Sequence, residues 1–317
     1  MSEKKIIAVV GATGSQGGGL VRAILDEANG GFAARAITRD PNSAKAKELA
    51  ALGAEVVSAN VDDVESVKRA FDGAYGVYCV TFFWEHFSPE KEGAEVAAQA
   101  KAAAAAGVKH AIWSTLEDTR KWVPLSDNRM PTLMGKYKVP HFDSKGESDH
   151  FFTDAGVPTT FLLTSFYWDN FINFGLGPRK GADGKLVLAM PLGNAKLGSM
   201  AAEDIGRCAH GIFKKGSELT GKRIGIQSEA LTGAEMAAQM SEALGQPVVY
   251  QAVPFDVFRG LGFPGAEDLG NMFQVYVEFE KEFLAPRETG YAKALNPRLQ
   301  SFRTWLSHNK SRIPITG

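Results

Sequence analysis

A histidine and a lysine stand four residues apart in the segment His141-Phe142-Asp143-Ser144-Lys145. On a helix, residues at this spacing lie on one face, so both side chains would point toward the same site. An imidazole gives and takes protons near neutral pH, and a lysine ammonium binds hydroxyl groups and stabilises negative charge. This pair is our candidate for proton transfer. His141 could equally bind a ligand or a loop, or face solvent at a helix start, and Lys145 could be a solvated helix residue.

A glycine-rich turn, GATGSQGG, follows the apolar run Ile6–Val10. Gly11, Gly14 and Gly17 have G-x-x-G-x-x-G spacing, and a helical pattern follows from about Gln16 to Glu27. This order of strand, glycine turn and helix is typical of dinucleotide-binding proteins, because the turn lets a pyrophosphate approach the backbone at a helix N-terminus. We expect the cofactor to contact Gly11, Thr13, Gly14, Ser15, Gln16 and Gly17.

The residues after the second predicted strand favour NADP(H) over NAD(H). The segment reads Ala36-Ile37-Thr38-Arg39-Asp40. NAD-binding domains place an acidic residue here, and a shift of one residue would give Asp40 that role. Arg39 directly follows the strand, however, and a guanidinium forms paired hydrogen bonds with a 2′-phosphate. We therefore predict NADP(H) as the cofactor, with Arg39 and Ser43 near its 2′-phosphate.

Strand and helix patterns alternate over residues 1–165, which we interpret as the NADP(H)-binding domain. Short apolar strands separated by helices predict an α/β fold, here a Rossmann-type doubly wound parallel sheet. Residues 166–317 are predicted to form a smaller, discontinuous α/β lobe that packs back on the first domain. The strands expected in the first domain are Ile6–Val10, Ala33–Thr38, Val56–Ala59, Val77–Val80, Ala111–Trp113 and Thr160–Leu163. Those expected in the lobe are Arg223–Gln227 and Val248–Val253, with helices from Thr232 to Leu244, Glu267 to Phe283 and Leu299 to Asn309.

Two local patterns lead to more detailed predictions. Asp62 can cap a helix, with Glu65 placed to complete the capping box. The segment from Leu116 to Pro140 is long and irregular and follows the fifth strand, where a doubly wound sheet binds its ligand. We interpret it as a lid or binding loop, and as a candidate moving part together with Phe166–Phe174. Tyr137, on this loop, could reach the site only if the loop is flexible.

Composition argues against several classes of function. The chain has 317 residues, a net charge of −1 and 44% apolar residues, which is ordinary for a globular protein. The charge gives no reason to expect direct binding to nucleic acid or to anionic membranes, and no apolar stretch is long enough to span a bilayer. Cys79 and Cys208 are predicted to be inert core thiols. We expect a protein of the cytoplasm, or of cytoplasm and nucleus, with no signal peptide and no metal site.

Several segments together resemble the NmrA-like branch of the atypical short-chain dehydrogenases. They are the glycine turn, Thr38-Arg39, Thr81 through Glu85, His141-x-x-x-Lys145-Gly146-Glu147 and, most specifically, the tail segment LGFPGAEDLGNMF at 261–273. Short-chain dehydrogenases have a catalytic tyrosine four residues before the lysine, and here His141 takes its place. The resemblance implies a Rossmann domain in which Lys145 binds the nicotinamide ribose, with further cofactor contacts from Asn60, Thr81, Phe82, Tyr167 and Asn170. At Asn60, relatives commonly have aspartate.

The resemblance implies two functions of different kinds. Our leading hypothesis is an NADP(H)-binding, redox-sensing regulator with little or no turnover, because members of this branch lack the tyrosine and bind protein partners such as a transcription regulator. The alternative is an NADPH-dependent oxidoreductase of a quinone, enone or similar carbonyl compound. Ser114 and Thr115 could orient its substrate oxygen, or could equally be ordinary hydroxyls at the end of a strand. A scaffold without cofactor is the third possibility. The apolar wall of the alternative would consist of Phe82, Phe83, Trp84, Phe166, Tyr167 and Trp168.

Overall fold

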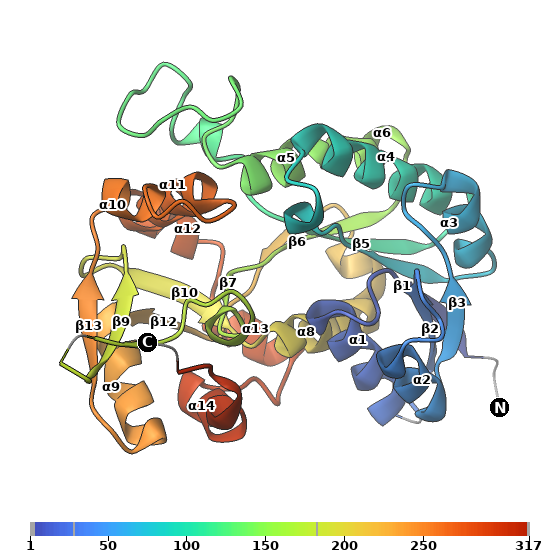
Figure 1. Cartoon of the computed structure of the whole chain (residues 1–317). Coiled ribbons are helices and arrows are strands. Elements are labelled where there is room, and N and C mark those ends of the chain that lie inside the picture. The colour runs from blue at the N-terminus through green and yellow to red at the C-terminus, as the bar shows by residue number, and fades with distance from the viewer. Residues whose placement is uncertain (1–3, 28, 182, 316–317) are drawn as a thin grey trace.

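The computed structural model describes residues 4–27, 29–181 and 183–315. Its main feature is a seven-stranded sheet with the order β11-β6-β5-β4-β1-β2-β3, in which every neighbouring pair is parallel (Figure 1). The chain leaves β1 in one direction to form β2 and β3 and crosses back to form β4, so β1 and β4 flank the switch point of a doubly wound sheet. The predicted fold class is confirmed. The strands are β1 (Lys5–Val9), β2 (Phe32–Thr38), β3 (Glu55–Ser58), β4 (Gly76–Cys79), β5 (His110–Thr115), β6 (Thr159–Leu163) and β11 (Arg223–Gly225).

Helices cover both faces of this sheet, as expected for parallel strands that are apolar on both sides. On one face, α1 (Ser15–Asp26) packs against α8 (Ala202–Lys215). The two backbones approach closely, because a Cβ at Gly206 would lie 2.1 Å from the backbone nitrogen of Leu20. On the other face lie α3 (Val64–Phe71), α4 (Pro89–Ala105), α5 (Pro140–Ser148) and α6 (His150–Asp154), while α2 (Ala44–Ala51) connects β2 to β3.

The start of α3 differs from the prediction by one residue. Asp63, and not Asp62, precedes the helix, and its carboxylate accepts hydrogen bonds from the backbone N–H groups of Glu65 and Ser66 at 3.0 and 3.2 Å. Both aspartates could cap, and the backbone of Asp63 has the extended conformation that a capping residue needs. The helix predicted from Thr232 to Leu244 begins with a capping box, in which the side chains of Thr232 and Glu235 each accept a hydrogen bond from the other residue's backbone N–H.

The second half of the chain contributes to two layers. β11 and α8 belong to the large sheet and its cover, although the sequence pattern placed the strand at 223–227 in the smaller lobe. The division of the chain near residue 165 itself stays a prediction. The lobe contains two small sheets, β12 (Glu229–Thr232) with β10 (Lys196–Met200) and β7 (Phe166–Tyr167), and β13 (Val248–Ala252) with β9 (Leu186–Met190) and β8 (Arg179–Lys180). Its helices are α7 (Asn170–Asn173), α9 (Gly233–Leu244), α10 (Phe255–Arg259), α11 (Ala266–Glu278), α12 (Glu280–Leu284) and α14 (Phe302–Asn309), whereas α13 (Thr289–Leu295) packs against α8.

The long segment from 116 to 140 is irregular, as predicted, but buried polar contacts fix its path. The carboxylate of Asp143 accepts hydrogen bonds from the backbone of Thr119 at one end and of Lys138 and Val139 at the other, at 2.7 to 3.0 Å. The side-chain amide of Asn271 on α11 donates to the carbonyl oxygen of Lys138 at 2.6 Å. In Figure 1 the middle of the segment extends away from the sheet, above α11.

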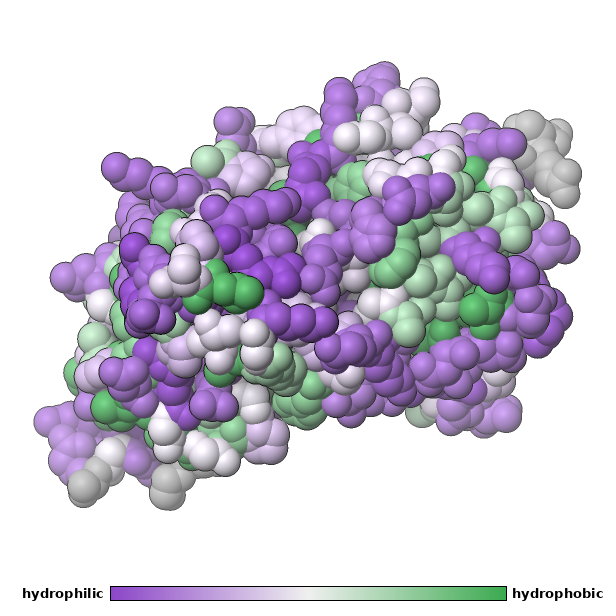
Figure 2. Space-filling view, turned by 90° about the horizontal axis from the view of Figure 1, so that it is seen from above, coloured by the Kyte–Doolittle hydropathy of each residue, from purple (hydrophilic) through white to green (hydrophobic). Residues whose placement is uncertain are grey.

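The outer surface is mainly hydrophilic on the face seen from above. Figure 2 shows hydrophilic residues over most of this face, with hydrophobic residues gathered mainly over its right-hand part. Among the described residues, no helix combines the length and the apolar character needed to cross a membrane. The described part of the chain also lacks a group of three or more His, Cys, Asp or Glu residues arranged to hold a metal ion.

Candidate functional site

A cavity of about 720 Å³ lies at the carboxyl ends of the parallel strands. The residues that follow β1, β2, β3, β4, β5 and β6 all line it, which is where an open α/β sheet binds its ligands. The structure brings every predicted cofactor residue to this one cavity, together with His141. These residues are Gly11, Thr13, Gly14, Ser15, Gln16, Gly17, Arg39, Ser43, Asn60, Thr81, Phe82, Lys145, Tyr167 and Asn170.

The glycine turn has the backbone geometry of an anion cradle. Gly11 has φ +64°, a conformation that L side chains rarely adopt, and a Cβ at Gly17 would lie 2.5 Å from the carbonyl oxygen of Gly11. The turn leads into α1, whose N-cap is Gly14. Within residues 14–26 neither a side-chain cap nor an acidic residue occupies the first turn, so its N–H groups are available to a phosphate.

Arg39 lines the cavity but is engaged by another side chain. Its guanidinium is ion-paired with the carboxylate of Glu85, and the hydrogen bond and positive charge of Arg39 lower the pKa of Glu85. Both side chains are exposed, at 63% and 45% of their surface, so the pair is weak and a phosphate could replace the carboxylate. The carboxylate of Asp40 accepts a hydrogen bond from the backbone N–H of Asn42, two residues along the chain, at 2.9 Å. Ser43 caps α2.

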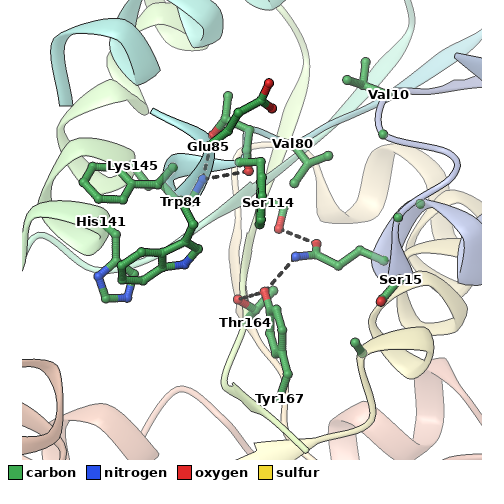
Figure 3. Close-up of a pocket in the computed structure, with 18 of the residues that line it drawn as sticks. Val10, Ser15, Val80, Trp84, Glu85, Ser114, His141, Lys145, Thr164 and Tyr167 are labelled. Atoms are coloured by element: carbon green, nitrogen blue, oxygen red, sulfur yellow. Dashed lines mark hydrogen bonds between the residues drawn. The ribbon is translucent and has the colours of Figure 1, made fainter. Parts of the chain in front are cut away.

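Gln16 joins three strand ends through its side-chain amide, and two of its partners, Ser114 and Tyr167, are labelled in Figure 3. Its oxygen accepts from the hydroxyls of Tyr78 at 2.5 Å and Ser114 at 2.8 Å, and its nitrogen donates to the hydroxyl of Tyr167 at 2.7 Å. The Tyr167 hydroxyl also lies 3.1 Å from that of Thr164. Burial raises the pKa of Tyr167 to about 12, so its hydroxyl keeps its proton at neutral pH. The sequence indicated Gln16 and Tyr167 separately, and nothing in it linked them to Tyr78.

Lys145 reaches the cavity from α5 and is held by a buried carboxylate. Its ammonium donates to the Thr81 hydroxyl at 2.6 Å and to Glu92 at 2.7 Å, with a longer contact of 3.3 Å to the Thr81 carbonyl oxygen. Glu92 is fully buried. Burial alone would raise the pKa of Glu92, but the charge of Lys145 and the hydrogen bonds from Lys145, Ser144 and Thr81 outweigh it and lower the pKa. Sequence analysis missed Glu92, which lies on the alanine-rich helix α4.

His141 occupies the position predicted for the acid–base residue and is not in solvent. Its ring nitrogen Nδ1 lies 2.6 Å from Asp268 Oδ1, and its backbone N–H donates to Asp268 Oδ2 at 3.1 Å. The ring packs against the indole of Trp84, with centroids 4.6 Å apart. Asp268 lies in the tail segment that carried the family resemblance, but its contact with His141 spans 127 residues and was not predicted.

An apolar wall faces these polar groups. Five of the six predicted wall residues line the cavity, and Trp168 does not. Trp168 is fully buried in the core of the smaller lobe, where its indole N–H donates to Ser199 at 2.8 Å. Helix α11 supplies wall residues that the sequence did not indicate. The wall consists of Phe82, Phe83, Trp84, Phe142, Phe166, Tyr167, Phe174, Leu269, Met272 and Tyr276.

The long segment does not cover the cavity. Leu116 lines the cavity, but none of residues 117–140 does, so the prediction of a lid in this segment is wrong. Tyr137 instead donates its hydroxyl hydrogen bond to Glu147 at 3.0 Å. Ser114 and Thr115 line the cavity as predicted, but both hydroxyls are engaged, with Gln16 and with Asp149.

The sheet, the switch point and the glycine turn together define a Rossmann-type fold. The sequence profile of the NmrA-like family matches residues 3–306. The chain therefore belongs to the NmrA-like family, as the sequence resemblance indicated.

Curated relatives cover most of this chain. An NmrA-like family domain-containing oxidoreductase, FrzB, from Cladobotryum sp is 29% identical over 300 residues, which are 89% of this chain and 86% of that protein. An NAD(P)H azoreductase from Xenophilus azovorans is 30% identical over 297 residues, which are 90% and 93% of the two chains.

Solved structures show the same fold. NmrA, a negative transcriptional regulator solved in complex with NADP, has a TM-score of 0.78 at 25% identity, with 96% of this chain and 95% of that chain covered. The Citrobacter sp. triphenylmethane reductase complexed with NADP(H) has a TM-score of 0.73 at 23% identity, over 95% and 99% of the two chains.

Proposed function

We propose that this protein is an NADPH-dependent oxidoreductase that reduces a conjugated carbonyl compound. The observation that carries the proposal is that the glycine turn, Arg39, Lys145 and the apolar wall line one cavity. A cofactor seated in the turn would present its nicotinamide toward the wall, where a planar apolar acceptor can lie against it. This function was the alternative of the sequence analysis, and the apolar residues that α11 adds to the wall favour it over the regulator.

The residues present fit NADP(H). The N–H groups of the glycine turn and α1 would bind the pyrophosphate, and Arg39 the 2′-phosphate. Lys145 would bind the nicotinamide ribose by replacing its long contact to the Thr81 carbonyl oxygen. The reduced nicotinamide, when bound, supplies a hydride. The protein's own part is to hold an acceptor on the apolar wall, to exclude water from it and to supply the proton that a reduced carbonyl needs.

A second function, a cofactor-sensing regulator, is favoured by the pairing of Arg39 with Glu85. Glu85 belongs to the short helical turn Phe83–Glu85, which also carries Trp84 of the wall. Binding of a 2′-phosphate to Arg39 would release Glu85 and could move this turn. A protein partner, such as a transcription regulator, that contacts the turn could then distinguish the two states. This function, like a location in cytoplasm or nucleus, stays a prediction.

The test of the proposed function is a turnover assay with a calorimetric titration beside it. We expect NADPH to bind with a dissociation constant in the micromolar range, and to be oxidised in the presence of quinones or aromatic enones. Arg22 lies on α1 outside the cavity and pairs with Glu48. The variant Arg22→Ala is therefore the matched control for Arg39→Ala in both measurements. Binding of NADPH without turnover of any acceptor would contradict the enzyme and leave the regulator.

A further inference from the structure

The contact between His141 and Asp268 joins two parts of the molecule. His141 is on α5, which covers the large sheet, and Asp268 is on α11 of the smaller lobe. Both side chains are more than nine-tenths buried. We propose that His141 is the proton donor of this site and that Asp268 positions it. This inference rests on the proposed function, because it names the source of the proton for that reaction.

The hydrogen bonds determine which ring nitrogen carries a proton. An ionised carboxylate can only accept hydrogen bonds, so His141 Nδ1 must carry the hydrogen that points to Asp268. The second carboxylate oxygen accepts from the backbone N–H of His141, which fixes Asp268 relative to the start of α5. Neutral His141 therefore has Nε2 unprotonated, and a further proton can only be taken up at Nε2.

The second ring nitrogen is available to the cavity. In the described part of the chain His86, His110 and His210 each have an enclosed ring nitrogen without a partner, and His141 is not among them. Its Nε2 has no hydrogen bond to any described residue, while the residue itself lines the cavity beside Trp84 and Lys145 (Figure 3). The indole of Trp84 covers the ring and limits its rotation. The imidazole is thus held on one side and free to react on the other.

The chemistry balances for an aromatic enone. The acceptor gains a hydride at its β-carbon, where a C–H bond forms, and the displaced electron pair moves to the carbonyl oxygen. That oxygen takes the proton from Nε2, which leaves neutral His141 and an enol that becomes the saturated ketone. Solvent returns the proton to Nε2. The hydride would come from NADPH, the reductant of the proposed function. The carboxylate of Asp268, hydrogen-bonded to Nδ1, stabilises the imidazolium before the transfer.

The experiment compares two acceptors that differ only in their need for a proton. An enone needs one, but a cationic triarylmethane dye becomes neutral on hydride addition and needs none. We expect His141→Gln to lower kcat for the enone about 100-fold and Asp268→Asn about 10-fold, while both variants reduce the dye within twofold of wild type. His308→Gln, at an exposed position on α14, is the control.

A second readout does not depend on turnover. In the ¹⁵N spectrum of histidine-labelled protein at pH 8, the signal that His141→Gln removes should show the Nδ1-protonated form, and Asp268→Asn should shift it toward the Nε2-protonated form. An unchanged form in Asp268→Asn would overturn the positioning role.

The outcomes separate this inference from the function on which it rests. A wild-type enzyme that reduces neither acceptor overturns the proposed function, and His141 then has no reaction to serve. Two results overturn only the role of His141. In the first, both variants reduce the enone as fast as the wild type does; in the second, both variants lose activity toward the enone and the dye equally. If the wild type reduces the enone and not the dye, binding of NADPH replaces dye reduction as the reference measurement. The dissociation constant of His141→Gln for NADPH must then lie within twofold of that of the wild type.

Discussion

The carboxylate of Glu85 forms an ion pair with the guanidinium of Arg39, at the place where a 2′-phosphate would bind. A negatively charged side chain of the protein thus stands where the distinguishing group of NADP(H) is expected. NADP(H) must displace this carboxylate, whereas NAD(H) has no group that competes with it. Two predictions about cofactor binding depend on this pair.

Removal of the competing charge should tighten NADPH binding. We expect Glu85→Gln to lower the dissociation constant of NADPH about two- to fivefold, since exposed ion pairs contribute about 0.2–1 kcal/mol. The dissociation constant of NADH should stay unchanged. Isothermal titration measures both, with Glu90→Gln, outside the cavity on α4, as the control for net charge. Equal tightening of both cofactors would show that Glu85 does not compete with the phosphate.

Removal of Arg39 should have the opposite effect. Arg39→Ala should weaken NADPH binding about 10- to 100-fold, because a charge-assisted hydrogen bond contributes about 1.5–3 kcal/mol. NADH binding should change by no more than about twofold. Arg22→Ala serves as the control, and fluorescence of bound reduced cofactor provides the titration signal. Equal losses for NADPH and NADH would remove the argument that Arg39 selects the phosphorylated cofactor.

The buried pair of Lys145 and Glu92 should behave differently in single and double variants. Glu92→Gln leaves the ammonium without its carboxylate and should lower the free energy of unfolding by about 3 kcal/mol. Replacement of both residues, Glu92→Gln with Lys145→Met, should recover most of that loss, because no charge is then left unpaired. Urea unfolding at pH 7 measures the four chains of this cycle: the wild type, Glu92→Gln, Lys145→Met and the double variant. Simple additivity of the two single changes would contradict the pairing.

Glu95 should make stability depend on pH between 4.5 and 7. Burial, followed by the charge of Asp62, raises the pKa of Glu95 from the ordinary 4.5 to about 7, against the opposing effect of Lys91. The folded state therefore holds a proton that the unfolded state has lost, so stability falls as pH rises through this interval and levels off above about 7. We expect Glu95→Gln to be more stable than wild type above pH 7 by on the order of 2 kcal/mol. Thermal unfolding of both chains at pH 5 and pH 8 measures it, and a constant difference would assign the pH effect elsewhere.

Local sequence patterns were sufficient for the elements of the sheet and for the glycine turn. The run from Ile6 to Val10 and the spacing of Gly11, Gly14 and Gly17 act within a few residues of each other, so they predict structure without knowledge of the rest of the chain. The same holds for the helix that carries His141 and Lys145. Local patterns therefore predicted the glycine turn, Arg39 and Lys145 as cofactor residues, whereas Asn60, Thr81, Phe82, Tyr167 and Asn170 were implied only by the family resemblance.

The partners of those residues could not be predicted, because they come from distant segments. Asp268 lies 127 residues from His141, and Glu92 lies 53 residues from Lys145. Trp168 also shows the limit: next to Tyr167 on the chain, it faces the core of the smaller lobe while Tyr167 faces the cavity. Trp168 is the first residue after β7, and only the tertiary packing of the smaller lobe decides which of the two neighbours meets the cavity.

The close contact of α8 on α1 has a consequence for synthesis on the ribosome. When residues 1–165 have emerged, the glycine turn is complete, but α8, which covers α1, has not yet been made. Until then Leu20 and Ile24 of α1 lack part of their cover, and β6 has an open edge because β11 is still missing. Until about residue 225 has emerged, the nascent chain therefore exposes apolar side chains of α1 and an unpaired edge of β6, two features that favour aggregation.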